Sequence, residues 1–174
     1  MLEVRIVFLC GSLDPGRDGV GDYTRRLAGE LIRQGVACRA IALNERALTQ
    51  PVEEVQASEG THSSVLRLPA SLSWRERAWR AKAWISEFQP DWVSLQFVPF
   101  GFQKKGLPFG LIRVVDGIAG AAKRHVMFHE LWLGSAKGSS FKHRAWGGLQ
   151  RVIILWPVFV LIHTTLSFVS SCWF

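Results

Sequence analysis

The chain has 174 residues, 48% of them hydrophobic and 20% charged, a composition typical of a globular protein rather than a disordered or fibrous one. A chain of this length buries roughly 70% of the surface that its unfolded form exposes, so it needs neither disulfides nor a metal to hold a core. The formal net charge of +7, from 21 Lys and Arg against 14 Asp and Glu, favours anionic partners.

The charge does not by itself identify that partner. Nucleotide phosphates, a phospholipid surface and nucleic acid are all anionic, but the sequence has no helix-turn-helix, zinc-finger, RRM or KH signature. We therefore expect a membrane surface or a phosphorylated small molecule, and no nucleic acid. The cysteines, Cys10, Cys38 and Cys172, form no Cys-x-x-Cys pair and predict neither a disulfide framework nor a zinc site. With no secretory signal pattern at the N-terminus, these features predict a cytoplasmic location.

The first part of the chain predicts a βαβ unit. The apolar run 4–10 is typical of a strand buried on both faces, and residues 11–21 form a loop with four glycines and a proline. Apolar residues then recur at helical spacing from Val20 to Leu31, and Gly35 is a stop signal. Residues 38–43 return to strand character, which completes the unit.

The middle of the chain predicts a second helix between two strands. Residues 44–64 are polar and indicate a loop or irregular excursion, followed by a short strand at 65–68. Ser73 is placed to cap a helix that Pro90 ends, and residues 92–97 predict the next strand. The apolar stripe of that helix consists of Trp74, Ala78, Ala81, Ile85 and Phe88, with Arg75, Arg77, Arg80 and Lys82 largely off it.

The last predicted elements are a helix at 112–122 and a fourth buried strand at 125–129, which runs into residues 130–132. Strands and helices alternate throughout. We therefore predict an α/β fold, a Rossmann-like doubly wound and mainly parallel sheet with helices on both faces, over residues 1–150.

Residues 151–174 form a separate hydrophobic segment. From Val152 onward it contains no Asp, Glu, Lys or Arg, and it is long enough to span the roughly 30 Å hydrocarbon core of a bilayer. Basic residues precede it, so a spanning helix would leave the domain on the cytoplasmic side. A proline, a histidine and several Ser and Thr weaken that interpretation. A transmembrane helix, a buried or interfacial segment and a non-native tail all stay open, and the domain is expected in the cytoplasm or at the inner membrane face.

The strongest candidate site is the loop and helix start Gly16-x-x-Gly19-Val20-Gly21-Asp22-Tyr23. Glycines there let the backbone approach a ligand closely, and the free amides of a helix N-terminus favour an anionic group such as phosphate. The segment is not a P-loop, since no Gly-Lys-Ser/Thr follows, and it also departs from the dinucleotide fingerprint. A flexible turn without a ligand is the alternative.

Two other strand ends carry candidate residues. His129 and Glu130 follow the fourth strand, and in open α/β sheets ligands bind at the carboxyl ends of strands. A neutral imidazole can hydrogen-bond a sugar hydroxyl, with the carboxylate fixing its orientation. Gln96 opens the aromatic and glycine loop 96–102, which is placed to line an acceptor pocket. The alternatives are a purely structural histidine and aromatic side chains that only pack against other loops.

Together these places resemble the N-terminal domain of retaining glycosyltransferases of the GT-B architecture, family four. The matching segments are residues 6–10 leading into Gly19-Val20-Gly21-Asp22-Tyr23-Thr24-Arg25-Arg26-Leu27-Ala28, residues 90–97, and residues 126–132. The resemblance covers about residues 4 to 150. It implies that this domain binds the acceptor and that a second, C-terminal domain binds most of the nucleotide sugar.

The resemblance also implies roles for single residues. Gly19 and Gly21 would present backbone amides near the donor phosphate, and His129 would contact the transferred sugar as the catalytic residue. Asp22, Tyr23, Gln96 and Glu130 complete the candidate donor-phosphate and acceptor-binding set. Transfer would need no cofactor and no metal, because the protein stabilises the charge of the leaving phosphate. The expected partners are a nucleotide sugar and a glycan or lipid acceptor.

One departure from the family pattern limits this implication. The C-terminal domain of the family should carry a Glu-x7-Glu motif, and the chain ends before such a domain could begin. Glu45 and Glu53 have that spacing by chance, with Pro51 between them. We therefore expect a truncated transferase half with little or no activity alone. The alternatives are a membrane-attached module that binds an acceptor or glycan without catalysis, and a nucleotide-binding α/β protein of another kind.

Overall fold

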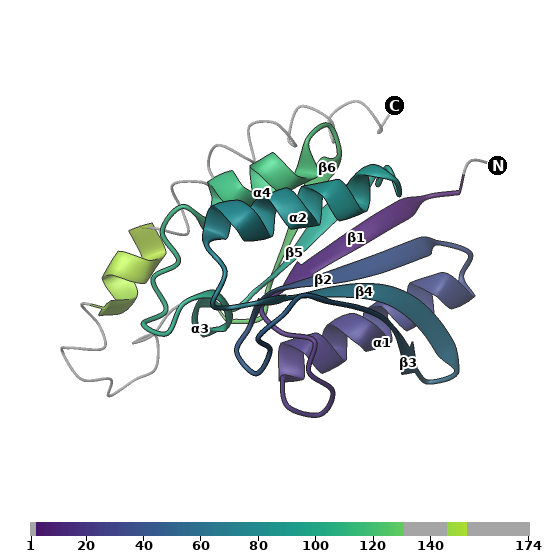
Figure 1. The fold of residues 1–174 in the computed structure, drawn as a ribbon, viewed down its shortest axis with the longest axis horizontal. Coiled ribbons are helices and arrows are strands. Elements are labelled where there is room, and N and C mark those ends of the chain that lie inside the picture. The colour runs from purple at the N-terminus through teal and green to yellow at the C-terminus, as the bar shows by residue number, and fades with distance from the viewer. Residues whose placement is uncertain (1–2, 131–145, 153–174) are drawn as a thin grey trace, which may run out of the picture.

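In the computed structural model, which describes residues 3–130 and 146–152, a six-stranded sheet carries helices on both faces (Figure 1). The strands are β1 (Arg5–Cys10), β2 (Ala37–Glu45), β3 (Val52–Ser58), β4 (Thr61–Pro69), β5 (Trp92–Phe97) and β6 (Lys123–Phe128). The helices are α1 (Gly19–Arg33), α2 (Trp74–Ser86), α3 (Pro99–Phe102) and α4 (Leu111–Ala119), and residues 146–152 are also helical. The predicted Rossmann-like α/β fold is confirmed.

The strand order is β3-β4-β2-β1-β5-β6, and all neighbours are parallel except the antiparallel pair β3 and β4. Helix α1 leads from β1 to β2 on one side of β1, whereas α2 leads from β4 back across to β5 on the other side. The strand order therefore reverses between β1 and β5. In open α/β sheets, the crevice at the carboxyl ends of the strands beside such a reversal is the usual place of ligand binding.

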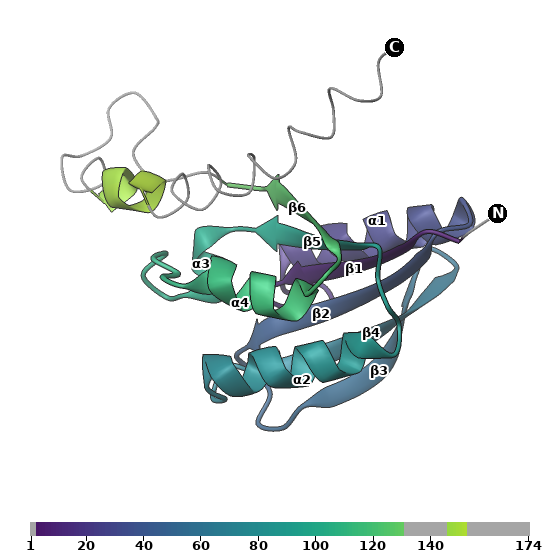
Figure 2. The ribbon, with the colours of Figure 1, turned by 90° about the horizontal axis from the view of Figure 1, so that it is seen from above.

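Strand β1 lies in the middle of the sheet and is buried on both faces, as its continuous apolar run predicts. Val7 and Leu9 belong to the core beneath α2 and α4, whereas Phe8 and Cys10 belong to the core beneath α1. Figures 1 and 2 show α1 on one face and α2 with α4 on the other. These two cores fix the end of β1, and with it the start of the glycine loop.

The helix signals in the sequence are mostly confirmed. Asp18 caps α1, and Gly35, with a φ of 83°, ends it as predicted. Ser73 caps α2 by accepting a hydrogen bond from the amide of Glu76. Helix α4 ends at Ala119, three residues earlier than predicted, because Gly120 takes a φ of 56°. The aromatic loop contains one short helix, α3.

Two strand predictions are wrong at the edges of the sheet. Residues 44–64 are not one loop, because β3 and a longer β4 form an antiparallel hairpin there. Its turn, Glu59 and Gly60, has two positive φ angles, the pairing that favours a tight hairpin. Strand β6 is not buried but alternates between exposed and half-buried residues. Among the strands that the structure describes, β3 and β6 stand at the two ends of the order.

Among the described residues, no helix is long and apolar enough to cross a membrane. The hydrophobic segment 151–174 falls outside the described residues from 153 onward, as do Leu131 and Trp132 of the third matching segment.

The position of Arg77 differs from the prediction, which placed this residue largely off the apolar stripe of its helix. Arg77 lies on the core side of α2, and only 5% of its surface is exposed.

Candidate functional site

A cavity of about 800 Å³ lies at the carboxyl edge of the sheet, beside the strand reversal. Loops that follow β1, β2, β5 and β6 form its walls together with the start of α1. Its lining residues are Ser12, Asp14, Arg17, Asp18, Gly19, Val20, Tyr23, Asn44, Glu45, Arg46, Ala47, Val98, Phe100, Gly101, His129 and Glu130. Four predicted site residues, Gly19, Tyr23, His129 and Glu130, therefore meet at one cavity.

His129 is held at this cavity by two neighbours from other elements. Its Nε2 lies 2.9 Å from Oε1 of Gln96, at the end of β5. Its ring also meets Tyr23 of α1 edge to face, with the ring centroids 4.8 Å apart. Gln96 is fully buried and does not line the cavity, so its observed role is to hold His129.

The surroundings of His129 favour the neutral form of its imidazole. Burial lowers its pKa, and the nearby carboxylate of Asp18 opposes this shift in part. Because Oε1 of Gln96 can only accept, Nε2 must carry the proton of the neutral ring. The other nitrogen, Nδ1, is then an acceptor, which suits a ligand hydroxyl better than a phosphate oxygen.

The two glycines at the start of α1 have different surroundings. Gly19 lines the cavity, and a Cβ built there would meet nothing within 4 Å. A Cβ at Gly21 would lie 2.4 Å from the carbonyl oxygen of Ser12, so Gly21 lets α1 pack against the loop after β1. The amide of Gly21 donates to the carboxylate of Asp18 at 2.7 Å. That amide is therefore already satisfied by the helix cap.

Asp22 also faces the loop rather than the cavity. Its Oδ1 accepts a hydrogen bond from the amide of Gly16 at 3.1 Å and pairs with the guanidinium of Arg25. Arg25 in turn donates to the carbonyl oxygen of Leu13. In this structure Asp22 shapes the glycine loop, and Gly21 fits the helix against it.

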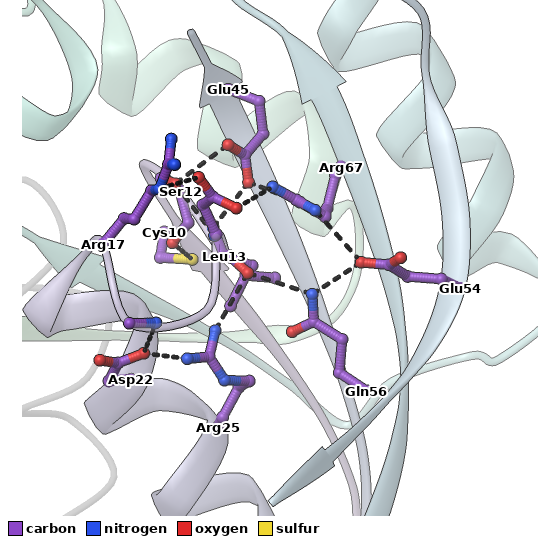
Figure 3. A network of polar contacts seen from close by, with 12 residues as sticks. Cys10, Ser12, Leu13, Arg17, Asp22, Arg25, Glu45, Glu54, Gln56 and Arg67 are labelled. Carbon is purple, nitrogen blue, oxygen red and sulfur yellow. Dashed lines mark hydrogen bonds and ion pairs between the residues drawn. The ribbon is translucent and has the colours of Figure 1, made fainter. Parts of the chain in front are cut away.

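A buried ionic network fixes the same loop from the sheet side (Figure 3). Arg67 of β4 donates to Glu45 at 2.8 Å and also lies within ion-pair distance of Asp14 and Glu54. Glu45, only 1% exposed, accepts hydrogen bonds from the amide of Leu13 and, through its other oxygen, the hydroxyl of Ser12. Ordinary loop flexibility is thus restricted by side chains from β2, β3 and β4.

The cavity lining carries charges of both signs. Asp14, Asp18, Glu45 and Glu130 stand against the cations Arg17 and Arg46, beside polar Ser12 and Asn44. Asp14 and Glu45 share Arg67, and Arg17 pairs with Asp14 at 3.7 Å. A lining that contains carboxylates, an amide and aromatic rings suits a polar ligand that both donates and accepts hydrogen bonds.

Sequence reasoning missed cavity residues at the end of β2 and just after it. Asn44 donates to the carbonyl oxygen of Gly101 at 2.8 Å and accepts from buried Arg77 at 2.9 Å, so it ties the aromatic loop to the sheet. Arg46 donates to the carbonyl oxygen of Phe100. The rule that drew attention to His129, a polar residue at a strand end, applies equally to Asn44 and Glu45. Glu53, by contrast, lies away from the cavity and accepts from the indole N–H of Trp84.

Within residues 3–130 and 146–152, no three His, Cys, Asp or Glu side chains are grouped so as to hold a metal ion.

Comparison with known proteins adds no assignment. No model of a protein family matches the chain. No curated protein matches it either.

Proposed function

We propose that this chain is the acceptor-side half of a sugar-transferring enzyme that uses a nucleotide-sugar donor. The observation that carries the proposal is the meeting of Gly19, Tyr23, His129 and Glu130 at one cavity beside the strand reversal. These are residues that the resemblance to GT-B glycosyltransferases singles out, and they come from two separate segments of the sequence.

The chemistry of the cavity supports a sugar ligand. Neutral His129 offers Nδ1 to a hydroxyl group, Glu130 is an exposed carboxylate acceptor, and the rings of Tyr23 and Phe100 offer apolar surface. In the proposal, His129 contacts the transferred sugar and the backbone of Gly19 faces the donor phosphate. Gly21 and Asp22 act indirectly by shaping the loop. No cofactor or metal takes part, and the proposed location is the cytoplasm.

Calorimetric titration of the chain with methyl hexosides, and separately with ATP and NAD, tests this proposal. We expect weak glycoside binding, and His129→Ala should lower the affinity at least about tenfold. A loss of this size corresponds to the free energy of one hydrogen bond between uncharged groups. The control His62→Ala changes a histidine of β4 that does not line the cavity. Tight binding of ATP or NAD without glycoside binding would instead favour a nucleotide-binding protein of another kind.

One observation favours a second candidate, a membrane-attached acceptor-binding module. Trp79 is 66% exposed on α2, and exposed Arg75 and Lys82 lie one turn before and after it on the same helix face. An aromatic ring between cations suits an anionic bilayer surface. This candidate predicts that the chain sediments with phosphatidylglycerol vesicles but not with phosphatidylcholine vesicles, and that Trp79→Ala weakens the association. Equal recovery with both vesicles would contradict it.

A further inference from the structure

A chain of hydrogen bonds runs from His129 at the cavity through the interior to His125 of β6. After the contact between His129 and Gln96, Nε2 of Gln96 donates to Oγ of Ser94 at 2.8 Å. Oγ of Ser94 lies 2.8 Å from Nδ1 of His125. Gln96 and Ser94 are 0% and 4% exposed, whereas His125 is at the surface. The link between Gln96 and Ser94 is therefore shielded from competing water.

We propose that Ser94 and His125 are positioning residues that fix the tautomer of His129 through Gln96. Neither of them lines the cavity. The importance of that tautomer for sugar transfer rests on the proposed function, but the tautomer itself is a property of this chain alone.

The direction of the hydrogen bonds decides which nitrogen of each histidine carries the proton. A glutamine amide has an acceptor at one end and donors at the other, so it distinguishes its two neighbours. With Nε2 donating to Ser94, only Oε1 is left for His129, which must donate from Nε2. The hydroxyl proton of Ser94 is then available for Nδ1 of His125, and in the proposed arrangement this nitrogen accepts it. All the bonds point from the cavity towards His125, and bonds aligned in this way reinforce one another.

Reversal of this chain of hydrogen bonds would change which nitrogen of His129 carries the proton at the cavity. If His125 donated from Nδ1, the hydroxyl of Ser94 could turn to Gln96, and the amide would have to rotate. The NH2 group of Gln96 would then face Nε2 of His129, and the proton of the neutral imidazole would have to sit on Nδ1. That nitrogen would donate to a ligand rather than accept from it. The acceptor state of Nδ1 of His125 is thus what selects an acceptor state for Nδ1 of His129.

Long-range ¹H–¹⁵N spectra of the chain labelled with ¹⁵N-histidine, recorded without ligand at pH 7.5, test the proposal. In the wild type we expect both His129 and His125 as Nε2–H tautomers. In Ser94→Ala and in His125→Ala, the Nε2–H form of His129 should fall from the dominant species to a mixture. Ser94→Thr, which keeps the hydroxyl, should restore it. Ser63→Ala and His62→Ala, on β4, are matched controls that should leave His129 unchanged.

An Nδ1–H tautomer of His129 in the wild type would overturn the proposal, as would an unchanged Nε2–H form in both Ser94→Ala and His125→Ala. If the buried change at Ser94 prevents folding, the surface variant His125→Ala still decides. The result is separate from the proposed function. The expected tautomers without any glycoside binding would contradict only the function, and glycoside binding through His129 with unchanged tautomers would contradict only the positioning.

Discussion

At the scale of single residues, the two glycines at the start of α1 have separate roles although they lie two positions apart. Gly19 is open to the cavity, whereas Gly21 allows the close approach of α1 to the carbonyl oxygen of Ser12. The sequence grouped both as candidate phosphate ligands, because a glycine pattern cannot show which member faces a ligand and which faces the backbone of a neighbouring loop.

Alanine substitutions separate these roles. Gly21→Ala should destabilise the protein by about 1–3 kcal/mol, because the new methyl group meets backbone that must shift. Gly19→Ala should change stability by no more than about 0.5 kcal/mol, because nothing lies near the added atom. Urea unfolding followed by circular dichroism measures both. Equal losses in the two variants would contradict the assigned packing.

The thiols of Cys10 and Cys38 are buried, and the same burial should make them unreactive. Desolvation raises the pKa of Cys10, with a further contribution from Asp18 and Glu45, and raises the pKa of Cys38 to about 11. Little thiolate is then present at pH 8, and an alkylating reagent in solution cannot reach the buried sulfur atoms. Peptide mass spectrometry after iodoacetamide treatment should find these two cysteines alkylated only when denaturant is added. Rapid labelling of Cys10 in the native protein would contradict the burial of β1.

At the scale of elements, the hairpin of β3 and β4 supports the site through Arg67. Removal of the cation would leave buried Glu45 without its partner, and breaking a buried pair in this way typically costs about 3–5 kcal/mol. We expect a loss of that size in Arg67→Met. Arg26→Met is the control, because Arg26 pairs with Glu59 at the surface, where an ion pair contributes less than about 1 kcal/mol. Similar unfolding midpoints for the two variants would refute the structural role of the network.

Elements whose signals are local were predicted from the sequence. The run of β1, the cap of α2 and the stop at Gly35 each depend on a few adjacent residues. The hairpin and the exposure of β6 were not predicted. Whether a strand lies at an edge of the sheet depends on which strands pair with it, and the topology sets this pairing rather than the adjacent residues. In the site, strand ends identified His129 and Glu130. The partnership of Glu45 with Arg67 was missed because the two residues are 22 positions apart and meet only through the pairing of β2 with β4.

At the scale of the whole molecule, the two histidines of the hydrogen-bond chain link stability to pH. Partial desolvation lowers the pKa of both His125 and His129, so each binds its proton less readily in the folded than in the unfolded protein. Between the unfolded value of about 6.5 and the lower folded values, the unfolded state binds more protons, and stability therefore rises with pH. The contribution is present above about pH 6.5 and is lost on acidification.

Unfolding free energies measured from pH 5 to pH 8 check this linkage. The wild type should lose stability as the pH falls below about 6.5, and the double variant His125→Gln/His129→Gln should show a shallower loss. His62→Gln, whose histidine has an exposed side chain on β4, should keep the wild-type slope. A slope that is the same in the double variant would place the source of the pH dependence elsewhere.

The molecule has a second hollow of about 670 Å³ on another face, between α2 and the hairpin, with Trp79 and Trp84 in its wall. A sugar can stack on exposed indole rings, so this hollow is the natural competitor of the carboxyl-edge cavity. We propose that a glycoside binds at the strand ends and not in this hollow.

Amide shift mapping of ¹⁵N-labelled protein during titration with a methyl hexoside tests this claim most directly. We predict saturable shifts at Gly19, Tyr23 and Glu130, together with the ring signals of His129. Shifts confined to Trp79, Trp84 and their neighbours on α2, or no saturable shifts at millimolar glycoside, would contradict the assignment of the site.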